Sequence, residues 1–128
     1  MYQVGIKNTF TAGHFLVGDF AEETQPHQHD YVVEWICSTN VLDENGFSVN
    51  IAVMEEELER LTARMRGGLL NDLEFFKDRQ VSVENMAHYM HAELLEALEA
   101  RSFSLESIRE FQVKIWESET AWAAYIHA

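Results

Sequence analysis

Three histidines near the N-terminus have the types and spacing of a metal site. His27 and His29 stand two residues apart in a β-favouring segment, so a strand would project both imidazoles from one face. His14 shares a face with Phe10 and Ala12 in an earlier alternating segment, and pairing of the two strands would let the three imidazoles converge. Three imidazoles leave one tetrahedral position open, as in catalytic zinc. The alternative is that each histidine is separately exposed or hydrogen-bonded in the core.

A glutamate near the C-terminus is a second candidate for chemistry. Alternation at period two places Glu117 on the same face as Phe111, Val113 and Ile115, where an unpaired charge would cost on the order of several kcal/mol. A buried carboxylate needs a partner with N–H donors, such as an amino-pyrimidinone ring held in bidentate fashion. The alternative is a strand that ends here and releases Glu117 to solvent.

A third group lies on a predicted helix. Glu84, His88 and His91 stand at positions i, i+4 and i+7, a spacing that can bind a metal or relay a proton. Pairing at the surface is the competing interpretation. Cys37 has no histidine beside it in the sequence, so we expect a buried, inert thiol rather than a nucleophile.

Hydrophobic periodicity defines the elements that must position these residues. Asn50 and Ser82 have the side chains of helix N-caps, and Gly67 follows the first helical stretch. The pattern predicts, in chain order, strands over Tyr2–Leu16 and Asp30–Cys37, helices over Ile51–Arg66 and from Ser82 to Arg101, and strands over Glu110–Glu117 and Ala121–His127. This β-β-α-α-β-β order predicts an α+β domain in which a four-stranded antiparallel sheet carries both helices on one face.

Composition narrows the choice of partners. The 128 residues suffice for one domain, and nine Lys and Arg against 22 Asp and Glu give a formal net charge of −13. Such a charge repels phosphate polyanions, so nucleic acid is not expected as a partner. The single cysteine excludes an internal disulfide, and no signal peptide or membrane-spanning stretch is visible. We therefore expect a cytoplasmic protein with no membrane partner.

Five short motifs follow one another along the chain. Residues 10–14 read F-T-A-G-H, 27–31 read H-Q-H-D-Y, 70–71 read L-N, 83–87 read V-E-N-M-A, and 116–125 read W-E-S-E-T-A-W-A-A-Y. In this order they resemble the 6-pyruvoyl-tetrahydropterin synthase and 6-carboxy-tetrahydropterin synthase family over nearly the whole chain. The corresponding family patterns are F-x-A-x-H, H-G-H-x-Y, the end of L-D-H-x-x-L-N, P-T-x-E-N-x-A and E-T-x-T-x-W-A-x-Y.

The resemblance implies a fold, a cofactor and a ligand. The family fold is the tunnelling fold, or T-fold, with the same β-β-α-α-β-β order. The family's zinc is held by three histidines, which correspond to His14, His27 and His29. Its pterin ring is anchored by a glutamate that corresponds to Glu117, and Thr120 lies in the same motif as a second substrate-binding candidate. The family also implies homo-oligomers, usually hexamers of two trimers whose active sites are shared between subunits.

The chain departs from the family pattern at its acid/base residues. The family's cysteine, four residues before the first histidine of H-G-H, is replaced by Glu23, and its Asp-His pair is replaced by Arg66 and Gly67. Some family members without the cysteine carry a glutamate in that neighbourhood and resemble aldolases that shorten the side chain of dihydroneopterin.

These departures leave three hypotheses. In the first, the protein is a zinc-dependent lyase or synthase acting on the side chain of dihydroneopterin or its triphosphate. Glu23 would then be the base, and His88 could replace the missing relay across a subunit boundary. In the second, it is a non-catalytic paralogue that binds zinc and a pterin or deazapurine. In the third, it is a structural oligomer in which metal serves stability alone.

Overall fold

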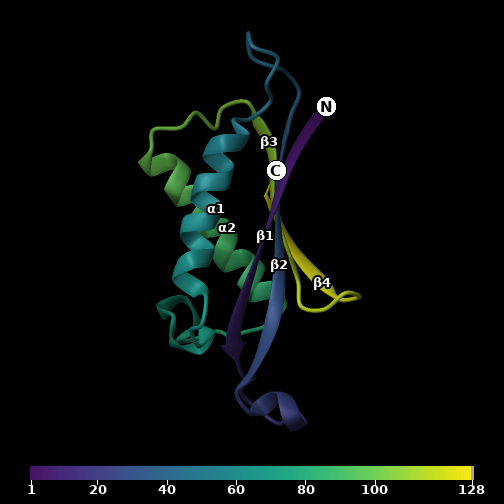
Figure 1. The fold of residues 1–128 in the computed structure, drawn as a ribbon, viewed down its shortest axis with the longest axis vertical. Coiled ribbons are helices and arrows are strands. Elements are labelled where there is room, and N and C mark those ends of the chain that lie inside the picture. Colours follow the sequence, from purple (N-terminus) through teal and green to yellow (C-terminus); the bar gives the residue numbers. More distant parts are fainter. Residues whose placement is uncertain (128) are drawn as a thin grey trace.

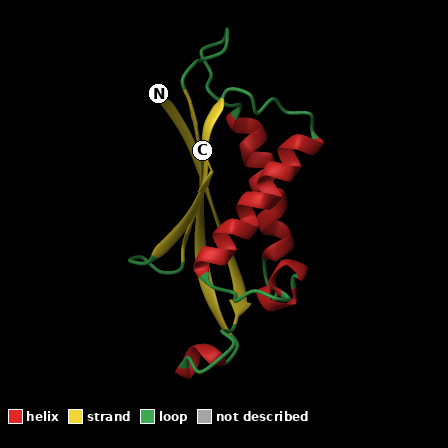
Figure 2. Cartoon of the chain, turned by 180° about the vertical axis from the view of Figure 1, so that it is seen from behind, coloured by secondary structure: helices red, strands yellow, loops and turns green. Residues whose placement is uncertain are grey.

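The computed structural model describes residues 1–127 and contains the six predicted elements in the predicted order (Figure 1). The elements are strands β1 (Tyr2–His14) and β2 (His27–Thr39), helices α1 (Ile51–Met65) and α2 (Val83–Ala100), and strands β3 (Ile108–Trp116) and β4 (Trp122–His127). The strands form one antiparallel sheet in the order β1-β2-β3-β4. Both helices cover the same face of this sheet (Figure 2), so the predicted α+β architecture is confirmed.

The helices form where cap residues and apolar stripes coincide. The Asn50 side chain accepts a hydrogen bond from the Val53 N–H, and the Ser82 side chain accepts one from the Asn85 N–H. The stripes of both helices are buried against the alternating inner residues of the sheet, among them Met54, Leu58, Leu94, Leu98, Val33, Trp35, Val113 and Ile115. Burial of these faces, rather than helix propensity, supplies most of the stability of the two helices.

The first two strands differ from the prediction where they meet. The predicted first strand ran to Leu16, but β1 ends at His14. The predicted second strand began at Asp30, but β2 begins at His27, which pairs with His14. The two histidines therefore form the last cross-strand pair of the hairpin. The difference is smaller for β3: the predicted strand includes Glu117, but β3 ends one residue earlier, at Trp116.

Side-chain amides explain why β1 stops at His14. The backbone N–H of Phe15 donates to Asn71 Oδ1 at 3.0 Å, and Asn71 Nδ2 donates to the Phe15 carbonyl at 3.0 Å. Gln80 satisfies both backbone groups of Val17 in the same way, at 2.7 and 2.9 Å. These amides replace a strand partner, so the backbone leaves the sheet without losing its hydrogen bonds.

The sequence predicts no helix or strand for the segment between the two long helices. It contains two short 3₁₀ helices, Leu70–Asp72 and Glu74–Phe76. Before them, the Gly67 N–H donates to the Thr11 carbonyl at 2.8 Å, and the Gly13 N–H donates to the Gly68 carbonyl at 2.9 Å. These bonds fix the segment along the C-terminal half of β1, beside the histidine end of the sheet.

Neither helix within residues 1–127 combines the length and the apolar character that crossing a bilayer requires.

His91 on α2 is a histidine whose burial favours the neutral imidazole. Its side chain packs against Phe111, and its Nε2–H donates to the Phe111 carbonyl at 3.1 Å. Burial lowers the pKa of His91, and the hydrogen bond to Phe111 only partly opposes this effect. Because the unfolded chain then binds the proton more tightly, we expect the free energy of unfolding to fall as the pH drops below about 6.5.

This prediction can be checked by urea unfolding of the wild type and a His91→Gln variant on both sides of pH 6.5. A glutamine amide can donate to the Phe111 carbonyl but carries no titrating proton, so the variant should lose less stability in acid. Burial also lowers the pKa of His14, but His14 is present in both proteins and cancels in the difference. Identical pH dependence of the two proteins would contradict the assignment.

Candidate metal centre

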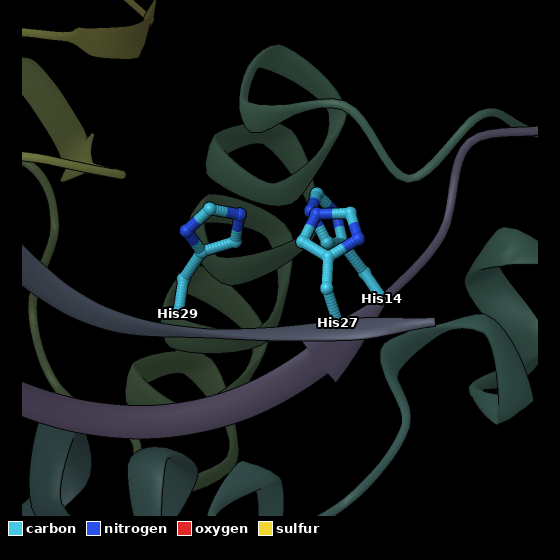
Figure 3. Close-up of side chains that lie close together, drawn as sticks. All are labelled: His14, His27 and His29. Atoms are coloured by element: carbon cyan, nitrogen blue, oxygen red, sulfur yellow. The ribbon is translucent and has the colours of Figure 1, made fainter. Parts of the chain in front are cut away.

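The sheet register brings three histidines to one end of the β1–β2 hairpin. His14 pairs with His27, and Ala12 pairs with His29, so the three imidazoles lie on the helix-facing side. The small Ala12 side chain leaves room opposite His29. One ring nitrogen from each histidine lies within 4.8 Å of the other two, and the rings converge (Figure 3). Within residues 1–127 this is the one cluster of three or more His, Cys, Asp or Glu side chains close enough to share an ion.

Backbone carbonyls fix which nitrogen is available for a ligand. The Nδ1–H of His14 donates to the Val81 carbonyl at 2.9 Å, and the Nδ1–H of His27 donates to the Gln25 carbonyl at 2.8 Å. The proton on Nδ1 leaves the Nε2 lone pair free in both rings. His29 also directs Nε2 toward the other two rings (Figure 3). Such outer hydrogen bonds are the usual means of orienting metal-bound histidines.

The three Nε2 atoms are buried and have no hydrogen-bond partner among the described residues. A buried polar atom without a partner costs about 1–3 kcal/mol, so three of them in one place call for a group that satisfies all three. Burial lowers the pKa of His14, and the neighbouring imidazoles lower it further, so this ring is neutral at neutral pH. Neutral imidazoles are the form that binds zinc and related transition metals. The residues therefore fit a divalent metal.

Glu117 lies at the edge of this cluster. Its Oε1 is 3.7 Å from His29 Nε2, and its side chain is 24% exposed. The residue is neither in the core nor fully in solvent, the two outcomes considered from the sequence. Thr120 lies in the same β3–β4 turn, exposed, and its N–H donates to Ser118 Oγ at 3.3 Å. Thr120 is therefore close to Glu117 along the chain, but its described hydrogen bonds are with Ser118 and not with the histidines.

Tyr31 closes the H-Q-H-D-Y motif, but the sequence alone assigns it no role at the site. It stands two residues after His29 on the same face, and its ring centroid is 5.5 Å from that of His29 and 6.2 Å from that of His14. Burial, and then the charge of Glu117, raise the pKa of Tyr31, so the phenol keeps its proton. The signal that could have identified it is its period-two spacing from His29.

Glu23 lies in the loop that joins two of the three histidines. The loop covers residues 15–26 and includes a short 3₁₀ helix, Ala21–Thr24, which begins in the left-handed region with φ 56° at Ala21. The Leu16 N–H donates to the Glu23 carbonyl at 2.7 Å, which ties the two arms of the loop together. The Glu23 side chain is exposed. None of the described hydrogen bonds or ion pairs joins Glu23 to the triad of His14, His27 and His29, so its carboxylate is open to solvent.

The other predicted site residues lie elsewhere. His88 stacks on Tyr125, with centroids 4.3 Å apart, and meets the edge of Phe75. Neither of these contacts involves His14, His27 or His29. Arg66 is held in a bidentate pair with Glu59, at 2.7 and 3.1 Å, on the surface beside β1.

Comparison with known proteins agrees with this architecture. The 6-pyruvoyl tetrahydropterin synthase family matches residues 3–128. The fold is similar to that of the Caenorhabditis elegans 6-pyruvoyl tetrahydropterin synthase, with a TM-score of 0.84 and 21% identity over 99% of this chain and 96% of that chain. No protein with a curated description matches significantly.

Two parasite proteins have the same fold. One is a Plasmodium vivax 6-pyruvoyltetrahydropterin synthase in which a glutamate described as a catalytic residue is replaced by cysteine. It gives a TM-score of 0.81 at 13% identity, over 98% of this chain and 97% of that chain. The Plasmodium falciparum 6-pyruvoyl tetrahydropterin synthase gives a TM-score of 0.77 at 16% identity, with the same coverage of both chains.

Proposed function

The chain belongs to the 6-pyruvoyl tetrahydropterin synthase family, and from this premise we propose that it is a zinc-dependent lyase acting on the side chain of a dihydropterin. The observation that carries the proposal is the set of three buried Nε2 atoms without partners. His14, His27 and His29 would hold the ion and leave one position for substrate. When bound, Zn²⁺ would supply Lewis-acid stabilisation of negative charge on a side-chain oxygen of the substrate.

We propose Glu23 as the base. With 7,8-dihydroneopterin, its carboxylate would take the proton of a side-chain hydroxyl, and the adjacent carbon–carbon bond would break as the hydroxyl carbon becomes a carbonyl. The same proton would return to the carbon left on the pterin, so the reaction needs no oxidant or reductant. The family cysteine is absent, and the glutamate described as catalytic in the Plasmodium vivax protein supports a carboxylate in this role.

We propose that Glu117 anchors the pterin ring, with Thr120 as a further contact. A carboxylate can accept two hydrogen bonds from the N–H groups of an amino-pyrimidinone. Glu117 is the carboxylate found within salt-bridge distance of the triad, and its partial exposure keeps it accessible to a ligand.

We propose that the functional unit is a cytoplasmic homo-oligomer, a hexamer of two trimers, with no nucleic acid or membrane partner. The sheet has two edge strands, β1 and β4, and β4 carries exposed Trp122 and Ile126. If a neighbouring copy covers Glu23 in this assembly, removal from water would raise the basicity of its carboxylate. Analytical ultracentrifugation tests the assembly directly.

Product analysis tests the proposed reaction. The zinc-loaded protein is incubated with 7,8-dihydroneopterin and, separately, with its triphosphate, and the pterins are identified by mass spectrometry. Metal-depleted protein is the control. A new pterin formed only by the zinc-loaded protein is expected, and its mass identifies the bond that breaks.

A second function is supported by a specific observation. Arg66 and Gly67 replace the family's Asp-His pair, and Arg66 is occupied by Glu59 rather than free to move protons. A protein that binds zinc and pterin without turnover would account for this loss. Binding of the dihydropterin to the zinc-loaded protein, with no product, would favour that alternative.

A further inference from the structure

Tyr31 presents an unsatisfied hydroxyl in the interior. Its side chain is 0% exposed, and the hydroxyl has no hydrogen-bond partner among the described residues. Native proteins pair most buried hydroxyls, because leaving one unpaired costs about 1–3 kcal/mol. A phenylalanine would fill the same volume without this cost, so the hydroxyl calls for a partner that the chain itself does not supply.

The position of Tyr31 ties this hydroxyl to the metal centre. On one side its ring stacks on Phe10, with centroids 5.1 Å apart, and toward the hairpin end it lies beside the rings of His29 and His14. On the other side, Val32 pairs with Trp116, so the next position along the strands places Glu117 beside Tyr31. Tyr31 thus lies between the three histidines and the core, next to Glu117, the carboxylate that we propose binds the pterin ring.

Other buried donors of the core have different surroundings. The buried Tyr89 on α2 has the carboxylate of Glu93 beside it as a partner. The Trp35 indole N–H also has no conventional partner, but Trp35 stands four residues after Tyr31 on β2, where the Cys37 thiol is its neighbour. Among the described residues, Tyr31 therefore carries the one buried side-chain hydroxyl without a partner, and its ring lies beside those of His29 and His14, whose Nε2 atoms also lack one.

We propose that the Tyr31 hydroxyl contacts the substrate, donating a hydrogen bond to an oxygen of the small molecule that binds at the three histidines. The inference rests on the proposed function, because it takes that ligand to be a dihydropterin side chain. A phenol in this position would strengthen its bond as negative charge develops on the oxygen, which is the role of an oxyanion donor. The hydroxyl would replace one of the polar groups that the family's cysteine and Asp-His pair provide and that this chain lacks.

A Tyr31→Phe variant tests the inference through binding rather than turnover. Zinc stoichiometry is measured by metal analysis, thermal stability without pterin by calorimetry, and the Kd for 7,8-dihydroneopterin by fluorescence titration of zinc-loaded protein. We expect unchanged zinc content, an equal or higher Tm, and a Kd about two- to tenfold weaker, the effect of one neutral hydrogen bond. Tyr89→Phe is the matched control: its Tm should fall and its Kd should match that of the wild type.

Three results would overturn the inference, and they can be told apart. Equal Kd values for the variant and the wild type would show that the hydroxyl does not touch the ligand. Loss of zinc or of Tm in the variant would show that the hydroxyl supports the fold or the triad instead. Absence of dihydroneopterin binding by the zinc-loaded wild type would refute the proposed function, and this inference with it.

Discussion

Replacement of His27 by alanine is expected to abolish stoichiometric zinc binding. The substitution removes one of the three converging Nε2 ligands, and two imidazoles alone do not hold zinc stably. Loss of outer-shell partners alone weakens metal binding about 10- to 100-fold, so loss of a direct ligand should exceed about 100-fold. His27 is the preferred target because its ring is less buried than that of His14, and its removal disturbs the core less.

Metal analysis after dialysis and thermal unfolding with added zinc measure this effect. Zinc at 100 times its Kd stabilises a folded protein by about 2.7 kcal/mol, so the wild type should show a clear rise in Tm. His27→Ala should show none. His127→Ala is the control, because His127 is an exposed histidine on β4 outside the triad, and it should retain full zinc binding. Undiminished zinc content in His27→Ala would refute the three-histidine site.

Replacement of Glu23 by glutamine is expected to stop turnover without stopping binding. Glutamine keeps the size of the side chain but cannot accept the substrate proton, and a general base contributes about 10²- to 10⁴-fold to rate. The Glu23 side chain is exposed and makes no described hydrogen bond, so the fold should be unaffected. We therefore expect a fall in kcat of that size with a dihydropterin Kd within about twofold of the wild type.

Single-turnover rates and fluorescence titrations separate the two quantities. Glu22→Gln provides a matched control, because it changes the adjacent carboxylate of the same 3₁₀ turn and the same net charge. Full turnover by Glu23→Gln would place the base elsewhere. Absence of turnover in the wild type, despite binding, would make the protein a zinc- and pterin-binding paralogue.

The order of elements and the faces of the sheet followed from the sequence. Period-two alternation within the predicted strand Asp30–Cys37 places Tyr31, Val33, Trp35 and Cys37 on one face, and all four are buried. Helical spacing within the predicted helix Ile51–Arg66 likewise places Met54, Leu58, Leu61 and Met65 on one face, and these four are buried too. These predictions succeed because the side-chain period of a strand or helix is a local property of the backbone, and burial of one face follows from it.

The sequence also predicted the cluster of three histidines, on the condition that the first two strands pair. An H-x-H spacing fixes His27 and His29 on one face of any strand, whatever that strand pairs with. The approach of His14 depended on the two strands being neighbours in the right register. A shift of one residue would have turned His14 to the opposite face.

Only the tertiary structure determines the protonation and the hydrogen-bond partners of the site residues. The carbonyls of Val81 and Gln25 select the tautomers of His14 and His27, and Val81 comes from the segment between the helices, for which the sequence predicts no element. The contact of Glu117 with His29 and the unsatisfied hydroxyl of Tyr31 depend on how β3 lies against β2. Hydrogen-bond partners, burial and electrostatic neighbours join residues far apart in the chain, and a local pattern carries no information about them. The sequence by itself therefore determined the candidate ligands and their scaffold, and packing determined their protonation, orientation and neighbours.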